Sequence, residues 1–201
     1  MDRSEQSATV SRPDYGEYWE RGLTWRHFLD DEVEKNVELW SGVYDSHRTP
    51  EWAIERVEAL GGDWKLLTIA EDWCGDASNT VPVVVRFAEA ASNVELRIVK
   101  RDENPGLMNH YLTNGSRSIP VVIALDADMR PVGHWASRPA ELQEQVVREK
   151  RAGVRSSKEI YRDSRRWYAR DKGESTLREL IEILEATVEH PAQAVDSGAG
   201  P

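Results

Sequence analysis

The chain of 201 residues contains a single cysteine, Cys74. One cysteine cannot form an intramolecular disulfide or contribute to a cysteine-rich metal site. This usage is typical of a reducing compartment, and we expect a cytoplasmic protein. The first six residues contain no apolar segment, which predicts that the chain as written has no secretory signal.

Long hydrophobic runs and excess positive charge are also missing. No apolar run approaches the roughly 20 residues that span a bilayer, so we expect no membrane partner. The formal net charge of -10 argues against general nucleic-acid binding. Hydrophobic residues make up 39% of the chain and charged residues 31%, which is typical of a soluble globular protein. The length fits about one domain with its own core.

The basic residues are concentrated in one segment. Residues 148–172 contain 10 lysines and arginines against 4 acidic residues, whereas the segments on both sides are net acidic. Such a segment is typical either of a patch for phosphates or anionic lipid, or of a solvated helix face that pairs with the acidic remainder of the chain. Because the flanking segments carry the opposite charge, we favour the second interpretation.

Composition and periodicity divide the chain into a central domain and helical extensions. Small and polar residues predict disorder over 1–13 and 190–201. Residues 14–152 are expected to form the main domain with an N-terminal helical extension, and residues 153–189 a C-terminal helical extension. Apolar residues at three- and four-residue steps predict one helix over 17–44.

The central region alternates between strand and helix patterns. Four short strands are predicted over 65–70, 94–100, 120–125 and 131–135, with a helix over 74–91 after the first. Strand–helix–strand links predict parallel pairing with right-handed crossovers, and a hairpin-sized link predicts that the last two strands are antiparallel. The expected fold class is α/β, with a small mixed central sheet flanked by helices and extra helices at both ends.

One motif lies where the first strand passes into its helix, and it reads Trp73-Cys74-Gly75-Asp76-Ala77. The free N–H groups and the macrodipole of a helix N-terminus favour a thiolate at Cys74. The negative charges of Glu71, Asp72 and Asp76 act in the opposite direction, because they raise the pKa of a nearby thiol. The sequence leaves the sign of the net shift open.

A second motif, Ile119-Pro120, leads from a loop into the third strand, a place that can accommodate a cis peptide bond. With it, the segment from about Lys65 to Val147 resembles the thioredoxin family. Residues 73–75 match the start of that family's Trp-Cys-Gly-Pro-Cys motif, and Pro82 matches the proline that kinks its active-site helix. Ile119-Pro120 matches the family's Ile-Pro, whose proline is cis and faces the cysteine. The resemblance implies a thioredoxin-like fold.

The chain departs from this family at three positions. The second cysteine of the family motif is Ala77 here, its proline is Asp76, and the family's buried acid falls on Thr68. Dithiol–disulfide exchange needs a resolving thiol in the same site. Because Cys74 is the only cysteine, the ordinary dithiol cycle is excluded unless two chains pair through Cys74, which would give a homodimer.

The resemblance implies a single nucleophilic thiol, for which the monothiol glutaredoxins give a precedent. On this interpretation Cys74 is catalytic: it attacks a disulfide of a protein or of a low-molecular-weight compound, and an external thiol resolves the mixed disulfide. The expected binding residues are Trp73, Gly75, Asp76, Ile119 and Pro120. Two alternatives stay open, a non-redox binding module and a redox sensor in which oxidation of Cys74 changes association.

No cofactor or metal is expected. The five histidines show no paired ligand spacing, and isolated surface acids rarely bind a cation. The monothiol glutaredoxins carry a basic residue shortly before the cysteine, where this chain has Asp72 and Trp73. Bound glutathione, alone or with an iron–sulfur cluster, is therefore poorly supported.

Overall fold

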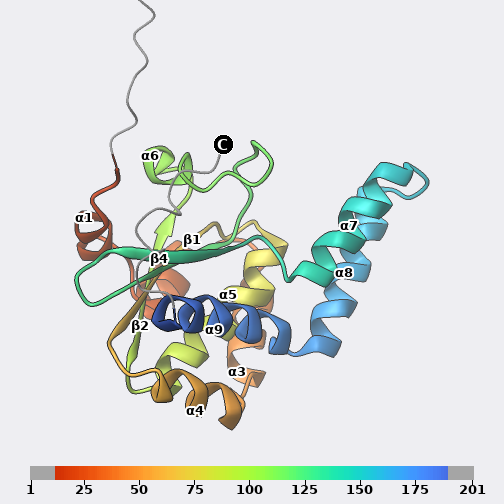
Figure 1. Cartoon of the computed structure of the whole chain (residues 1–201). Coiled ribbons are helices and arrows are strands. Elements are labelled where there is room, and N and C mark those ends of the chain that lie inside the picture. The colour runs from red at the N-terminus through yellow and green to blue at the C-terminus, as the bar shows by residue number, and fades with distance from the viewer. Residues whose placement is uncertain (1–11, 190–201) are drawn as a thin grey trace, which may run out of the picture.

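The computed structural model describes residues 12–189, whose centre is a four-stranded mixed sheet (Figure 1). The strands, in the spatial order β2-β1-β3-β4, are β1 (Trp64–Ala70), β2 (Val94–Lys100), β3 (Val121–Leu125) and β4 (Pro131–Ala136). The predicted α/β fold class is confirmed. The disorder predicted over residues 1–13 and 190–201 lies outside the described residues except at residues 12 and 13, which are in no helix or strand.

Strand directions agree with the sequence-based expectation at two of three links. β1 and β2 are parallel and joined by a helix, and β3 and β4 form an antiparallel pair. The link from β2 to β3 does not give a parallel pair, because β3 lies antiparallel to β1 on the side away from β2. Every residue of β3 is buried, as is expected for a continuous apolar strand covered on both faces.

Helices cover the sheet on both sides. Figure 1 shows α5 (Gly75–Ala90), α9 (Glu174–Glu189) and α4 (Glu51–Ala59) on one side, and α6 (Pro105–Met108) on the other. The helix α6 is a single turn, with its C-cap at Asn109. No helix of the described chain is both long and apolar enough to cross a bilayer.

The single helix predicted over 17–44 is wrong. The structure has four short elements there: α1 (Tyr15–Glu20), α2 (Trp25–His27), the π-helical turn η1 (Phe28–Glu32) and α3 (Val37–Ser46). The break after α1 has a clear cause, since Leu23 and Ile98 of β2 exchange N–H···O bonds of 2.7 and 2.9 Å. The chain must be extended at Leu23 to make them, and Gly22 allows this approach because a Cβ there would lie 2.8 Å from the Cβ of Arg97.

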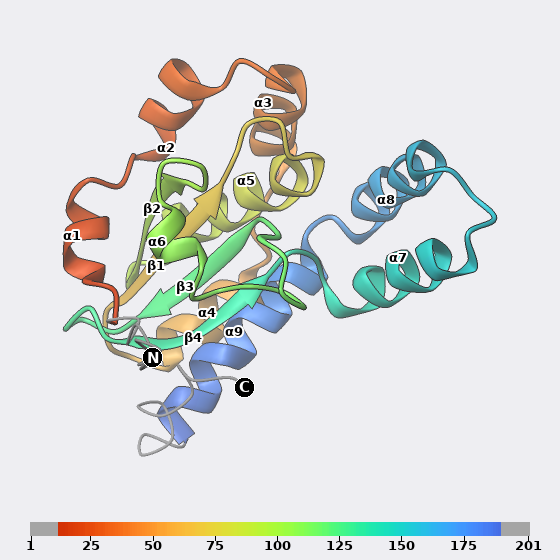
Figure 2. The ribbon, with the colours of Figure 1, turned by 90° about the horizontal axis from the view of Figure 1, so that it is seen from above.

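The helices α7 (Ala140–Ala152) and α8 (Ser157–Asp171) form a hairpin that projects from the rest of the molecule (Figure 2). The hairpin has a small apolar core of its own, formed by Leu142, Val146, Ile160, Trp167 and Tyr168. Since this core is separate from the main one, the hairpin is a distinct packing unit. At the turn, polar contacts connect the two helices.

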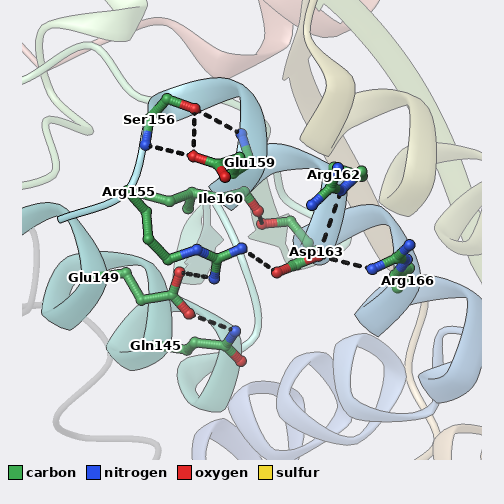
Figure 3. Close-up of polar contacts among 10 residues, drawn as sticks. Gln145, Glu149, Arg155, Ser156, Glu159, Ile160, Arg162, Asp163 and Arg166 are labelled. Atoms are coloured by element: carbon green, nitrogen blue, oxygen red, sulfur yellow. Dashed lines mark hydrogen bonds and ion pairs between the residues drawn. The ribbon is translucent and has the colours of Figure 1, made fainter.

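Arg155 connects the two helices of this hairpin (Figure 3). Its guanidinium pairs with Glu149 of α7 at 2.6 Å and with Asp163 of α8. Ser156 then caps α8 through a capping box with Glu159. Arg166 also reaches Asp163, at 3.2 Å. Part of the basic segment is thus neutralised inside the hairpin.

A substitution at Gly133 of β4 tests how closely α9 packs on the sheet. A Cβ at this position would lie 2.5 Å from Cγ2 of Ile183, and a β-branched residue in a helix has little freedom to move away. We expect Gly133→Ala to lower the free energy of unfolding by about 1–3 kcal/mol, measured by urea denaturation.

The matched control is Gly42→Ala in α3, where an added Cβ meets no atom within 4 Å. Alanine is the better helix former, so we expect this variant to gain up to about 1 kcal/mol. Equal losses in both variants would contradict the close contact between α9 and β4.

Candidate functional site

Cys74 is the N-cap of α5 and lies against the loop that leads into β3. Its Sγ accepts a hydrogen bond from the N–H of Ala77 at 3.4 Å and donates one to the carbonyl of Ile119 at 3.5 Å. The Ile119–Pro120 peptide bond is cis. The structure therefore brings together the two motifs that the sequence separates by 45 residues.

The thiol is mostly covered, with 8% of Cys74 exposed. Burial raises the pKa of the Cys74 thiol, and the negative charge of Asp76 raises it further. The N–H groups of Ala77 and Asp76 and the charge of Arg138 act against this shift without cancelling it. The effect that sequence reasoning left open is thus a net rise, so the thiol is protonated at neutral pH.

Asp76 lies in the first turn of α5 and is itself nearly buried. Its carboxylate accepts hydrogen bonds from the guanidinium of Arg138 at 2.5 Å and from the hydroxyl of Tyr168 at 3.0 Å. The side chains of Asp76 and Arg138 are only 11% and 13% exposed. Arg138 comes from the segment between β4 and α7, and Tyr168 from α8. The hairpin therefore contacts the helix that presents the thiol.

Sequence reasoning missed Arg138 and Tyr168. They are 62 and 92 residues from Asp76, and neither belongs to a recognisable motif. One signal was available, because an acid at a position where the family has proline needs a partner once it is buried. The sequence does not say which arginine supplies that partner.

Two other predicted binding residues, Trp73 and Gly75, adjoin Cys74 in the chain and have different surroundings. Trp73 is 40% exposed, and the guanidinium of Arg101 lies 4.6 Å from its ring centroid. An exposed aromatic ring beside a thiol offers an apolar contact surface. Gly75 lies in an open part of the first turn, where an added Cβ would meet nothing within 4 Å.

The two acids that precede the motif stabilise the fold near the site. Asp72 accepts the backbone N–H groups of Glu34 and Lys35 at 3.1 and 2.8 Å, and so holds the chain ahead of α3. The carboxylate of Glu71 accepts the N–H of Asp102 at 2.8 Å, and burial raises its pKa. Both carboxylates accept hydrogen bonds from backbone N–H groups. Their charges are not among the main causes of the Cys74 shift.

Two of the three positions at which this chain departs from the family pattern are buried. Ala77 and Thr68 are fully buried, and the hydroxyl of Thr68 has no hydrogen-bond partner among the described residues. No carboxylate therefore stands at Thr68 to exchange protons beneath the thiol. Within residues 12–189, no three histidine, cysteine, aspartate or glutamate side chains come together as a metal site would need.

A sequence model of the family described as Thioredoxin matches residues 22–153. The chain belongs to the thioredoxin family. Tyr168 lies beyond the part of this thioredoxin-family protein that the match covers, whereas Asp76 and Arg138 lie inside it. The contact at Asp76 thus joins the family region to the C-terminal helices.

Two solved structures resemble this thioredoxin-family protein. A protein of unknown function from Pseudomonas aeruginosa superposes with a TM-score of 0.69 at 18% identity, covering 88% of this chain and 99% of the other. An HIV epitope scaffold gives a TM-score of 0.68 at 18% identity, covering 87% and 99%. At this identity the likeness shows the fold alone. A search of curated proteins gives no significant match.

Replacing Asp76 tests its influence on the thiol. In Asp76→Asn the negative charge that raises the Cys74 pKa is removed and the charge of Arg138 remains, so we expect the pH midpoint of iodoacetamide alkylation to fall. Because Arg138 then loses its carboxylate partner, we also expect the variant to lose about 3 kcal/mol of stability.

Asp72→Asn is the matched control. It removes an acid two residues before the cysteine that accepts hydrogen bonds from backbone N–H groups, and its charge is not among the main causes of the rise in the Cys74 pKa. We expect some loss of stability and an unchanged alkylation midpoint. A midpoint that moves equally in both variants would contradict a specific role for Asp76.

Proposed function

We propose that this thioredoxin-family protein carries out monothiol thiol–disulfide exchange through Cys74. The observation that supports this most is the position of Sγ, between the N–H of Ala77 at the start of α5 and the carbonyl of Ile119. The N–H can stabilise a thiolate, and the backbone beside Pro120 can pair with an extended substrate chain.

The proposed reaction has two balanced steps. The Cys74 thiolate attacks one sulfur of a substrate disulfide, and the other sulfur leaves as a thiolate that takes up the proton lost by Cys74. An external thiol, deprotonated for attack, then attacks the substrate sulfur of the mixed disulfide and releases Cys74. One disulfide is consumed and one is formed, so the protein undergoes no net oxidation.

The surroundings of the sulfur set the rate and the substrate of this reaction. Because burial and Asp76 raise the Cys74 pKa, the thiolate fraction is small at neutral pH and increases as the pH rises. The exposed ring of Trp73 would contact apolar groups beside the substrate disulfide. Ala77 fills the place of a second cysteine, so release depends on a thiol from another molecule.

The experiment is reaction with a small aromatic disulfide, followed by intact-protein mass spectrometry. We expect one mixed-disulfide adduct on Cys74, formed faster as the pH rises from 7 to about 10 and removed by added thiol. Cys74→Ser should give no adduct. If folded protein gives no adduct at any of these pH values while urea-unfolded protein reacts readily, the proposal is wrong.

A second candidate function, a non-redox binding module, is favoured by one observation. The sulfur is almost buried and its pKa is raised, whereas Trp73 beside it is accessible. On this proposal the Trp73 face holds an extended segment of a partner protein, and the thiol serves only packing.

The two candidates give different results with two variants. If the binding module is correct, a partner captured by the protein is retained by Cys74→Ser and lost from Trp73→Ala, measured by affinity capture under reducing conditions. A partner captured only without reductant, retained by Trp73→Ala and lost from Cys74→Ser, would instead favour exchange chemistry, because a reductant cleaves the mixed disulfide.

A further inference from the structure

A pocket of about 970 Å³ lies between α3, the segment that follows it, and the junction of α8 with α9. Cys74 does not line it. Tyr168, which contacts Asp76, is the residue of the thiol site that also forms part of the pocket wall. The pocket is thus a separate cavity beside the site described above.

Four cationic side chains line this pocket: Arg48, Arg165, Arg170 and Lys172. All four are exposed, and within residues 12–189 none of them lies within 4.0 Å of a carboxylate oxygen. Arg48 donates only to the backbone carbonyls of Asp45 and His47. The pocket therefore has cationic groups available for a ligand.

Two other arginines of α8 behave differently. Arg162 and Arg166, together with Arg155 from the turn, gather around Asp163 (Figure 3). Of the ten basic residues of the segment, three are thus paired inside the hairpin, three line the pocket without an acidic partner among the described residues, and four lie exposed outside it. A general solvated face, as we favoured from the sequence, does not explain why three of them line one pocket.

Three acids also line the pocket, and two of them are occupied. Glu174 pairs with Arg178 at 2.8 Å. The carboxylate of Asp171 accepts the N–H and the hydroxyl of Ser175, at 3.2 and 2.5 Å, at the start of α9. The third acid is Glu38 in the first turn of α3. Only Glu174 is neutralised by a cation, so the four cations face two carboxylates, those of Asp171 and Glu38, that have no cationic partner among the described residues.

The rest of the wall suits an organic ligand. Its apolar surface comes from Leu39, Val43, Pro50 and Val83. His47 is 8% exposed, and its Nε2 has no hydrogen-bond partner among the described residues. Burial and the nearby charge of Arg86 lower the pKa of His47, so the imidazole is neutral at pH 7 and the positive charge comes from arginine and lysine.

We infer that this pocket binds a small organic anion that carries two or more phosphate or carboxylate groups. Guanidinium groups match the oxygens of both kinds of anion with paired hydrogen bonds, and the apolar wall would hold the organic body. Arg165 and Arg170 are the two lining cations that α8 supplies, and we expect both to contact the anion.

The test is isothermal titration calorimetry of the full chain at low ionic strength with two probes, citrate and adenosine diphosphate. We expect binding of at least one probe, weakened about tenfold or more by the double variant Arg165→Gln/Arg170→Gln. Arg148→Gln/Arg151→Gln is the matched control, since it removes the same charge from exposed positions of α7 outside the pocket. Cys74→Ser should bind as the unchanged protein does, whether or not exchange chemistry occurs.

Three results would overturn the inference. The first is that neither probe binds. The second is equal weakening by both double variants, which would indicate long-range attraction without a site. The third is binding to phosphatidylserine vesicles with no binding of the soluble probes, which would assign the cations to a lipid surface. Circular dichroism melting of both double variants verifies that each is folded.

Discussion

The arrangement around the thiol depends on the buried carboxylate of Asp76. A charge that is 11% exposed needs compensation, and Arg138 and Tyr168 supply it from two different parts of the chain. The same contact attaches the projecting hairpin to the first turn of α5. One ionised group therefore helps to hold α8 against α5 and, together with burial, raises the pKa of the neighbouring thiol.

Two opposing effects act on Cys74, and burial is the larger. The start of α5 offers an N–H at 3.4 Å from Sγ, which stabilises negative charge. Desolvation and the carboxylate of Asp76 outweigh it, because water does little to stabilise a thiolate on a mostly buried sulfur. Position at a helix N-terminus is thus not sufficient for a reactive thiolate. A substrate of the proposed exchange would have to react with a weakly acidic thiol or change these surroundings on binding.

The sequence predicted the features that depend on neighbouring residues. The strand patterns, the cysteine at a helix start and the Ile119–Pro120 loop could all be located by local pattern or by resemblance to the thioredoxin family. The prediction of one helix over 17–44 was wrong because the pairing of Leu23 with Ile98 overrides helical periodicity. Arg138, Tyr168 and the pocket beside α8 could not be predicted, since each depends on contacts between elements far apart in the chain.

The pairing at Leu23 has a further consequence for the assembled sheet. β2 is an edge strand, and such an edge can recruit a strand from another molecule through its free backbone groups. The segment at Leu23 occupies that side of β2 at Ile98, with Gly22 close against Arg97. The backbone groups of Ile98 are therefore already paired within the chain, which leaves less of this edge available to a strand from another molecule.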